Sequence, residues 1–165
     1  MIKVVVTGAA GRMGSRLVSL VKDSAFLTLA GAVESKGHHA VGEDSGEVAG
    51  CGRTGVLIAD DLSRVMERGE VVVDFTTPSA TLGHLSIVAQ YRRGIVVGTT
   101  GFSSSELDEL RLFSRQIPCV FSPNMSVGVN VIYKVIAEMA KTLGEDYDIE
   151  VIEAHHRLKK DAPSG

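Results

Sequence analysis

Short apolar runs alternate with amphipathic stretches along most of the chain. Runs rich in Val and Ile predict strands, whereas apolar positions spaced three or four residues apart predict helices. The predicted strands are residues 3–7, 27–33, 56–59, 71–75, 94–98, 118–121 and 147–154. The predicted helices are residues 12–24, 61–67, 79–93, 104–116 and 127–143. This alternation is typical of successive βαβ units.

The apolar runs also indicate the kind of sheet. An uninterrupted run such as Val71-Val72-Val73 suits a strand that is buried on both faces, as in a parallel sheet covered by helices. Right-handed crossovers between such strands give a doubly wound α/β sheet. We expect this first domain to span residues 1–126, and residues 127–165 to begin a second domain of α+β type that is cut short. Residues 38–55 are polar and rich in glycine, and are predicted to form a long surface loop.

Single residues mark the ends of two predicted helices. Ser103 or Ser104 can cap the helix of residues 104–116, with Glu106 near its positive end. Gly144 is placed to end the helix of residues 127–143.

Composition excludes several classes of protein. The 165 residues are 44% hydrophobic and 22% charged, which is typical of a folded globular chain. The net charge of −3 gives no general reason to expect nucleic acid as a partner. Cys51 and Cys119 are too few for a disulfide framework or a metal site, and no apolar stretch approaches the ~20 residues that cross a bilayer. We therefore expect a cytoplasmic protein that binds no metal, nucleic acid or membrane.

A glycine-rich turn follows the first predicted strand and opens the first predicted helix. Gly8, Gly11 and Gly14 permit a tight turn, close approach of a pyrophosphate and close packing of helix on strand. Glu34 ends the second predicted strand, where an acid accepts a hydrogen bond from an adenosine ribose. Glycines alone fit any strand-to-helix turn equally well, but the order of all these features predicts a Rossmann-type dinucleotide site. Lys36 could neutralise a 2′-phosphate, so both NADH and NADPH stay open.

Three further strand ends carry small polar residues. They are residues 74–78, 98–102 and 122–125, and the first two fall on the sheet edge where ligands of such folds bind. Ordinary helix capping by Thr and Ser explains these residues equally well.

The last thirteen residues hold two adjacent histidines and several cations. Such a cluster is either an exposed loop or a pocket for a ligand with several carboxylates or phosphates. Taken alone, His155 and His156 fit a surface pair, and Lys159 fits a solvated charge.

These motifs together resemble the 4-hydroxy-tetrahydrodipicolinate reductase (dihydrodipicolinate reductase) family. The matching pieces are residues 8–14, 74–76, 98–101, 124–130 and 153–165, and the resemblance covers the whole chain. It implies that His155 is a catalytic proton donor or acceptor, that Lys159 is the catalytic proton donor, and that His156, Ser164 and Gly165 bind substrate. It implies cofactor binding by Gly8, Ala9, Ala10, Gly11, Arg12, Met13, Glu34, Gly98, Thr99, Thr100, Ser122, Pro123, Asn124 and Met125.

The resemblance also implies an activity. Family members reduce the dicarboxylate (4-hydroxy-tetrahydro)dipicolinate with NADH or NADPH, in diaminopimelate and lysine biosynthesis, as homotetramers. They are longer than this chain, so residues 1–165 alone are expected to have little or no reductase activity. Some members carry Arg at the positions of Ser35 and Thr77, and these differences leave the choice of cofactor open. We expect use of both.

Two other functions fit parts of the sequence. Another two-domain Rossmann oxidoreductase is one, although an enzyme acting through a thioester needs a cysteine that neither Cys51 nor Cys119 supplies. A non-catalytic module that senses NAD(P)H is the other. The basic C-terminal cluster argues against a sensor, which has no use for a carboxylate-binding loop.

Overall fold

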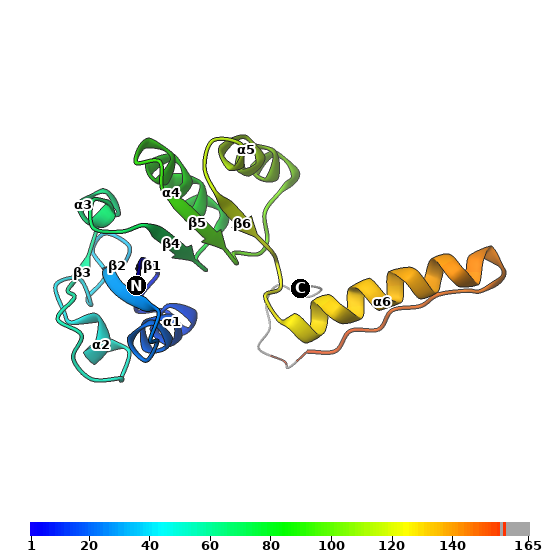
Figure 1. Ribbon diagram of the computed structural model, residues 1–165, viewed down its shortest axis with the longest axis horizontal. Helices are drawn as coiled ribbons and strands as arrows, with labels where there is room; N and C mark the ends of the chain where they lie inside the picture. Colours follow the sequence, from blue (N-terminus) through cyan, green and yellow to red (C-terminus); the bar gives the residue numbers. More distant parts are fainter. Residues whose placement is uncertain (156, 158–165) are drawn as a thin grey trace. The chain divides into compact units, whose positions relative to one another are not determined.

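The computed structural model describes residues 1–155 and 157, and it divides into two compact units, residues 1–121 and 122–165. The strands are β1 (Ile2–Thr7), β2 (Leu27–Val33), β3 (Ile58–Ala59), β4 (Val71–Asp74), β5 (Gly94–Val97) and β6 (Cys119–Phe121) (Figure 1). The helices are α1 (Arg12–Lys22), α2 (Ser45–Val48), α3 (Ser63–Met66), α4 (Pro78–Gln90), α5 (Ser104–Ser114) and α6 (Val127–Leu143), followed by the 3₁₀ turn η1 (Gly144–Asp146).

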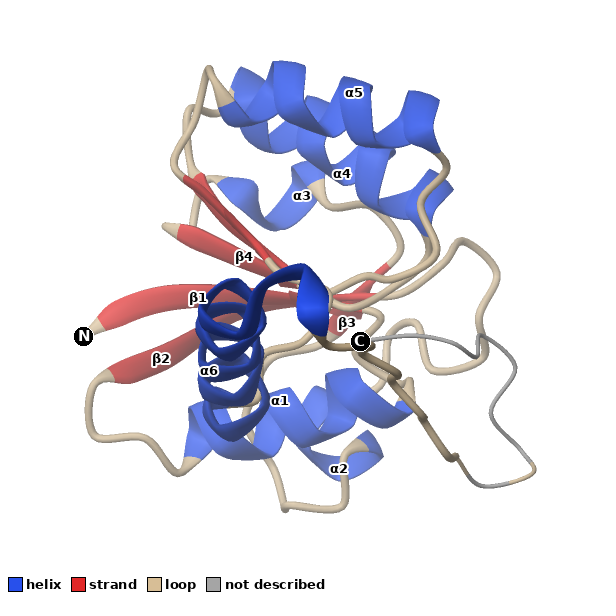
Figure 2. Cartoon of the chain, turned by 90° about the vertical axis from the view of Figure 1, so that its right-hand side faces the viewer, coloured by secondary structure: helices blue, strands red, loops and turns tan. Residues whose placement is uncertain are grey.

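The first unit is a six-stranded parallel sheet in the order β3-β2-β1-β4-β5-β6. Figure 2 shows α1 and α2 on one face of this sheet, and α3, α4 and α5 on the other. The prediction of a doubly wound Rossmann-type sheet is confirmed. The strand order reverses between β1 and β4, and ligands of such sheets bind at that switch point, beyond the carboxyl ends of the strands.

Alternate residues of β1 face the two sides of the sheet and join separate cores. Val5 packs with Val72, Leu85 and other residues beneath α3, α4 and α5. Val4 and Val6 belong to the second cluster, which lies beneath α1. Both clusters consist of side chains at most 5% exposed. The sheet is therefore a rigid platform for the turns that leave its carboxyl edge.

The predicted helix ends are confirmed. Ser103 caps α5, and Glu106 completes a capping box: the Ser103 hydroxyl accepts from the Glu106 N–H while the Glu106 carboxylate accepts from the Ser103 N–H. Gly144 ends α6 with a φ of 72°, a backbone conformation that side chains disfavour. Pro78 occupies the first turn of α4, where its missing N–H costs nothing.

The second unit differs from the prediction in one element. Residues 147–154 were expected to form a strand, but they pair with no other described backbone, and Val151 and Ile152 are 82% and 90% exposed. Their apolar pattern was correct for a strand, yet a strand needs a hydrogen-bonding neighbour, which the described residues do not supply. That prediction is wrong for this structure. The boundary at residues 126 and 127 stays a prediction.

Helix α6 presents apolar side chains along its length, including Val131, Ile132 and Met139, and none of its described residues is buried. Neither this helix nor any other in the described part of the chain is long and apolar enough to span a membrane.

The predicted loop of residues 38–55 is more ordered than expected, because it folds around one carboxylate. Asp44 is 4% exposed and caps the short helix α2. It accepts hydrogen bonds from the backbone N–H groups of Gly46, Glu47, Thr54 and Gly55 and from the Thr54 hydroxyl. The bond from Thr54, with the others, outweighs desolvation and holds the pKa of Asp44 well below its ordinary value.

This lowered pKa predicts acid-sensitive folding. A carboxylate with a lower pKa in the folded state stabilises that state above its unfolded pKa, and the contribution is lost as the pH falls through its folded pKa. The variant Asp44→Asn should therefore be less stable than wild type at pH 7, by a difference that shrinks as the pH falls below about 4. Urea unfolding at several pH values measures this difference, with the exposed Asp23→Asn as control. A difference independent of pH would contradict it.

Candidate cofactor and active site

A cavity of about 580 Å³ lies at the carboxyl edge of the sheet, in the first unit. Its walls come from the glycine turn after β1, the ends of β2 and β3, the residues after β4, and one face of α4. This is the switch point of the sheet, and the volume falls within the range of small-molecule pockets. The cavity is therefore the candidate binding site of the first unit.

The glycine turn forms one wall through Gly8 and Gly11. Gly8 has a φ of 61°, and a methyl group there would lie 2.9 Å from Cγ2 of Thr76. The Gly11 N–H closes the turn on the Gly8 carbonyl at 2.9 Å, and the Ala9 N–H donates to the Val33 carbonyl at 3.0 Å. The turn can thus bring its backbone close to a ligand only because no Cβ stands in the way.

The other predicted residues of this turn have different surroundings. Ala9 is fully buried in the core beneath α1, and Ala10 is partly buried. Arg12 and Met13 are exposed in the first turn of α1. None of these four lines the cavity, but the backbone of Arg12 and Met13 forms the start of α1, where N–H groups attract an anion.

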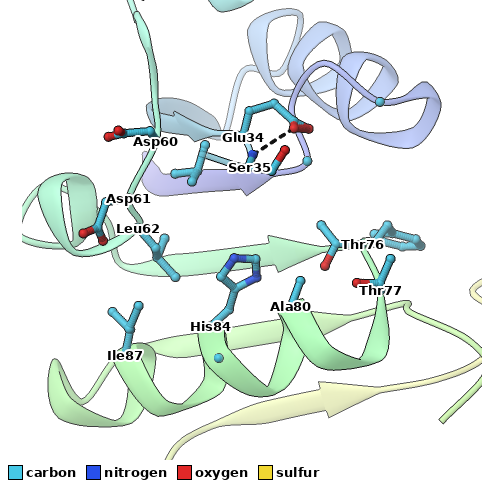
Figure 3. Close-up of a pocket in the computed structure, with 15 residues that line it drawn as sticks. Glu34, Ser35, Asp60, Asp61, Leu62, Thr76, Thr77, Ala80, His84 and Ile87 are labelled. Atoms are coloured by element: carbon cyan, nitrogen blue, oxygen red, sulfur yellow. Dashed lines mark hydrogen bonds between the residues drawn. The ribbon is translucent and has the colours of Figure 1, made fainter. Parts of the chain in front are cut away.

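Carboxylates line the side of the cavity formed by β2 and β3. Glu34 directly follows β2, and its side chain accepts a hydrogen bond from the Ser35 N–H at 3.0 Å (Figure 3). Asp60 and Asp61 directly follow β3, where they also line the cavity. The cavity therefore unites the predicted ribose acid with the predicted glycine turn.

Helix α4 supplies the opposite wall. Figure 3 shows Ala80, His84 and Ile87 on the face of α4 that is turned toward Glu34 and Ser35. Leu62 adds a further apolar surface from the residues after β3. Apolar side chains facing one another across such a cavity can hold a flat heterocycle, while the polar groups at its edge orient it.

A buried carboxylate anchors this wall. Asp74 is 0% exposed, and its Oδ2 lies 2.7 Å from Nδ1 of His84. Its Oδ1 accepts from the Thr76 N–H at 2.9 Å and the Thr76 hydroxyl at 2.6 Å, with the hydroxyls of Thr81 and Thr99 at 3.3 and 3.4 Å. Asp74 thereby links β4 to α4 and to the turn after β5.

The surroundings of Asp74 keep it ionised. Burial by itself raises the pKa of Asp74. The hydrogen bond and charge of His84, together with the hydrogen bonds from Thr76, lower the pKa by more than burial raises it. The net result is a pKa below the ordinary value. Asp74 is a carboxylate at neutral pH and holds His84 in a fixed orientation at the cavity wall.

The turn after β5 holds the predicted residues Gly98, Thr99 and Thr100. A methyl group on Gly98 would lie 2.1 Å from the ring of Phe75, so only glycine fits there without moving that ring. Thr99 is 2% exposed, and its hydroxyl lies 2.8 Å from that of Thr81. These three residues do not line the cavity, and they lie on the adjoining part of the same sheet edge.

The remaining predicted residues belong to the second unit. Ser122, Pro123, Asn124 and Met125 precede α6, and the Ser122 hydroxyl donates to the Asn124 carbonyl at 2.7 Å. Nδ1 of His155 contacts the carboxylate of Glu153, so one ring nitrogen is held by its own segment. Lys159, His156, Ser164 and Gly165 lie outside the described residues.

Sequence reasoning missed the cavity residues contributed by β3 and α4. Asp60 and Asp61 follow the third strand in the order of the chain, at the same sheet edge as Glu34, so the rule that places ligands there could have found them. His84 gave no such signal. It lies on the same face of α4 as Ala80 and Ile87, and its contact with Asp74 becomes apparent only in the fold. Among the described residues, no three His, Cys, Asp or Glu side chains are grouped to hold a metal.

The arrangement fits a dinucleotide. The glycine turn provides a cradle that a Cβ would fill, and Glu34 stands where a ribose hydroxyl can donate to it. The apolar wall of α4 suits an adenine ring.

Comparison with known proteins agrees with this fit. The family profile described as "Dihydrodipicolinate reductase, N-terminus" matches residues 2–125, and the one described as "Dihydrodipicolinate reductase, C-terminus" matches residues 128–165. The chain is 49% identical to a 4-hydroxy-tetrahydrodipicolinate reductase of Syntrophus aciditrophicus and 50% identical to one of Geobacter sulfurreducens, each over 165 residues.

A solved structure agrees as well. The dihydrodipicolinate reductase of Paenisporosarcina sp. TG-14, with dipicolinate bound, is similar with a TM-score of 0.71 and 26% identity over 100% of this chain. The chain spans 62% of the length of that protein and of both relatives. The two family profiles together account for nearly every residue, and the chain belongs to the dihydrodipicolinate reductase family.

Proposed function

We propose that this chain supplies the cofactor site and part of the substrate site of an NAD(P)H-dependent 4-hydroxy-tetrahydrodipicolinate reductase. The observation that carries the proposal is the family match, which extends from the glycine turn to the basic C-terminal cluster. The cavity at the switch point supports it independently, because it brings Gly8, Gly11 and Glu34 together. The reaction belongs to diaminopimelate and lysine biosynthesis.

The family match also bears on the alternatives. It decides against another two-domain Rossmann oxidoreductase, because both profiles describe the same reductase. A sensor that binds NAD(P)H without turnover is distinguished by the assay below.

The residues divide the work between holding the cofactor and managing the substrate. Gly8, Gly11 and the start of α1 hold the pyrophosphate by backbone N–H groups, and Glu34 accepts from the ribose. The turn Gly98–Thr100 and the segment Ser122–Met125 hold the nicotinamide end. The reduced nicotinamide, when bound, supplies a hydride.

The C-terminal cluster handles charge and protons. A substrate with two carboxylates needs several donors, which His156, Ser164 and Gly165 provide. Reduction of a conjugated imine leaves an electron-rich product that must gain a proton, and Lys159 or His155 donates it. The dipicolinate in the Paenisporosarcina enzyme is itself a dicarboxylate, which supports this substrate class.

We predict that Lys159→Ala and His155→Ala lower kcat in the complete enzyme by about 100-fold or more, the usual contribution of a general acid. Cofactor affinity should change less than about threefold, because neither side chain is assigned to the cofactor. The assay follows NAD(P)H oxidation with freshly prepared dihydrodipicolinate.

Lys160→Ala is the matched control, since it removes the same charge from the neighbouring position. It should keep most of the activity. Unchanged turnover in both Lys159→Ala and His155→Ala would remove these residues from catalysis. No turnover by the wild-type enzyme, with NAD(P)H bound, would favour the sensor. The homotetramer and the cytoplasmic location also stay proposals.

A further inference from the structure

Carboxylates outnumber cationic side chains among the described residues that line the cavity. Three carboxylates line it, those of Glu34, Asp60 and Asp61, and no Lys or Arg is among the described residues that do so. Glu34 follows β2 and the two aspartates follow β3, and these two strands are paired at the sheet edge. A ligand in this cavity meets these three carboxylates and, among the described residues, no lining Lys or Arg.

The nearest cations are already committed to these acids. Arg64 pairs with Asp60 at 2.9 Å, and its own side chain is 68% exposed. The Ser63 hydroxyl and N–H donate to Asp61, and with them the charges of Arg64 and Lys36 hold the pKa of Asp61 below its ordinary value. Asp61 is therefore ionised at neutral pH. Lys36 is exposed and does not line the cavity.

His84 does not reverse this balance. It is the one histidine among the described lining residues, and its Nδ1 lies 2.7 Å from the buried carboxylate of Asp74. If the ring carries a positive charge, that charge is matched by Asp74 directly behind it. The lining therefore offers no uncompensated cation to an anionic group near the ribose.

We propose that Asp60 and Asp61, together with Glu34, make this enzyme select NADH against NADPH. The proposal rests on the proposed cofactor function and deepens it. NADPH differs from NADH only in a phosphate on the adenosine ribose, which brings about two further negative charges. Glu34 accepts from the free hydroxyl of NADH, and Asp60 and Asp61 repel the phosphate that replaces it in NADPH.

Selection of NADH differs from the expectation that both cofactors are used. That expectation rests on Lys36 and on Ser35 and Thr77, whose positions carry Arg in some family members. In the structure Lys36 is a single cation beside three carboxylates, and its charge helps to lower the pKa of one of them, Asp61. Charges of the same sign as a ligand group, placed next to it, discriminate strongly between two ligands that differ only in that group.

The test is equilibrium binding of NADH and NADPH to the purified protein, without substrate. The chain has no tryptophan, so the fluorescence of the nucleotide itself, or calorimetry, is the signal. We expect wild type to bind NADH at least about tenfold more tightly than NADPH at low salt. Raising the salt from about 0.02 M to about 0.5 M should narrow this ratio, because screening weakens repulsion between charges.

Two variants locate the effect. Asp61→Asn keeps an oxygen for Ser63 and removes the charge, and it should lower the preference about threefold. Asp60→Asn combined with Asp61→Asn also releases Arg64, and should lower it further. Glu67→Gln is the matched control, since Glu67 is an exposed acid at the end of α3 that does not line the cavity, and its preference should equal that of wild type.

The outcomes separate this inference from the function on which it rests. Failure of both nucleotides to bind would overturn the proposed cofactor function and the inference with it. Binding of both with equal affinity, or a preference that Asp60→Asn with Asp61→Asn leaves unchanged, would overturn the inference and leave the cofactor function standing. A change of equal size in Glu67→Gln would overturn it too, because the effect would then be one of net charge.

Discussion

Replacing Gly14 by alanine is expected to destabilise the protein by about 3 kcal/mol, at the upper end for a side chain forced into a packed space. Gly14 lies in the first turn of α1 and is buried. A methyl group there would lie 1.9 Å from the Gly8 carbonyl oxygen, 2.6 Å from the Gly8 carbonyl carbon and 2.8 Å from Cα of Ala9. All three atoms belong to the backbone, so no side chain can rotate away.

The same clash should strongly weaken dinucleotide binding. To admit the methyl group, α1 must move away from the turn that carries Gly8 and Gly11. The N–H groups at the start of α1 then no longer point to the place where the pyrophosphate is held. We expect the Gly14→Ala variant to bind NADH at least about 100-fold more weakly, which corresponds to about 2.8 kcal/mol. Thermal unfolding and nucleotide binding measure the two effects separately.

Gly83→Ala is the matched control for stability. Gly83 lies in the interior of α4, and a methyl group there meets no heavy atom within 4 Å. Alanine is the better helix former by about 1 kcal/mol, so this variant should be as stable as wild type or more so. Equal stability changes in Gly14→Ala and Gly83→Ala would show that contact with the turn does not determine the requirement for glycine at position 14.

The sheet was predictable because its signals are local. Runs such as Val71-Val72-Val73 specify strands buried on both faces, and Gly14 specifies a close approach of helix and strand. The glycine turn and Glu34 were predictable as one site, because strand order alone brings the ends of β1 and β2 together. The cap at Ser103 and the helix end at Gly144 likewise depend on neighbours within a few residues.

What was missed depends on contacts between distant residues. The Asp44 side chain is satisfied by backbone groups up to eleven residues away, so a polar stretch became an ordered loop. The contact of His84 with a carboxylate ten residues earlier is made by the fold and not by neighbouring sequence. The strand expected at residues 147–154 needed a neighbour that local sequence cannot supply. Periodicity reports burial, but it does not report which partner provides it.

Replacing Asp74 by alanine is expected to cost about 3–5 kcal/mol, because it removes a buried carboxylate and leaves the donors around it without an acceptor. The loss has two parts. The hydroxyls of Thr76, Thr81 and Thr99 and the ring of His84 lose their common acceptor, and the bonds from Thr81 and Thr99 are buried. Buried donors without partners are more costly than a missing hydrogen bond that water can replace.

The isosteric variant Asp74→Asn separates charge from shape. Its amide oxygen can still accept from the threonines, while its NH₂ group faces Nδ1 of His84, which accepts when the ring carries its proton on Nε2. We expect a smaller loss of about 1–3 kcal/mol, because hydrogen bonds to a charged acceptor are replaced by weaker neutral ones. Because Thr76 and His84 line the cavity, this folded variant should also bind NADH about tenfold more weakly.

Asp108→Asn is the control, because Asp108 is 71% exposed and pairs only with the exposed Arg111. Exposed pairs contribute little, so its stability should stay within about 0.5 kcal/mol of wild type and its NADH affinity unchanged. Urea unfolding and nucleotide titration provide both measurements. If Asp74→Asn lost no more stability and affinity than Asp108→Asn, the charge of the buried carboxylate would contribute nothing to stability or to nucleotide binding. The wall formed by α4 would then owe its position to the packing of Leu85 and Val88 alone.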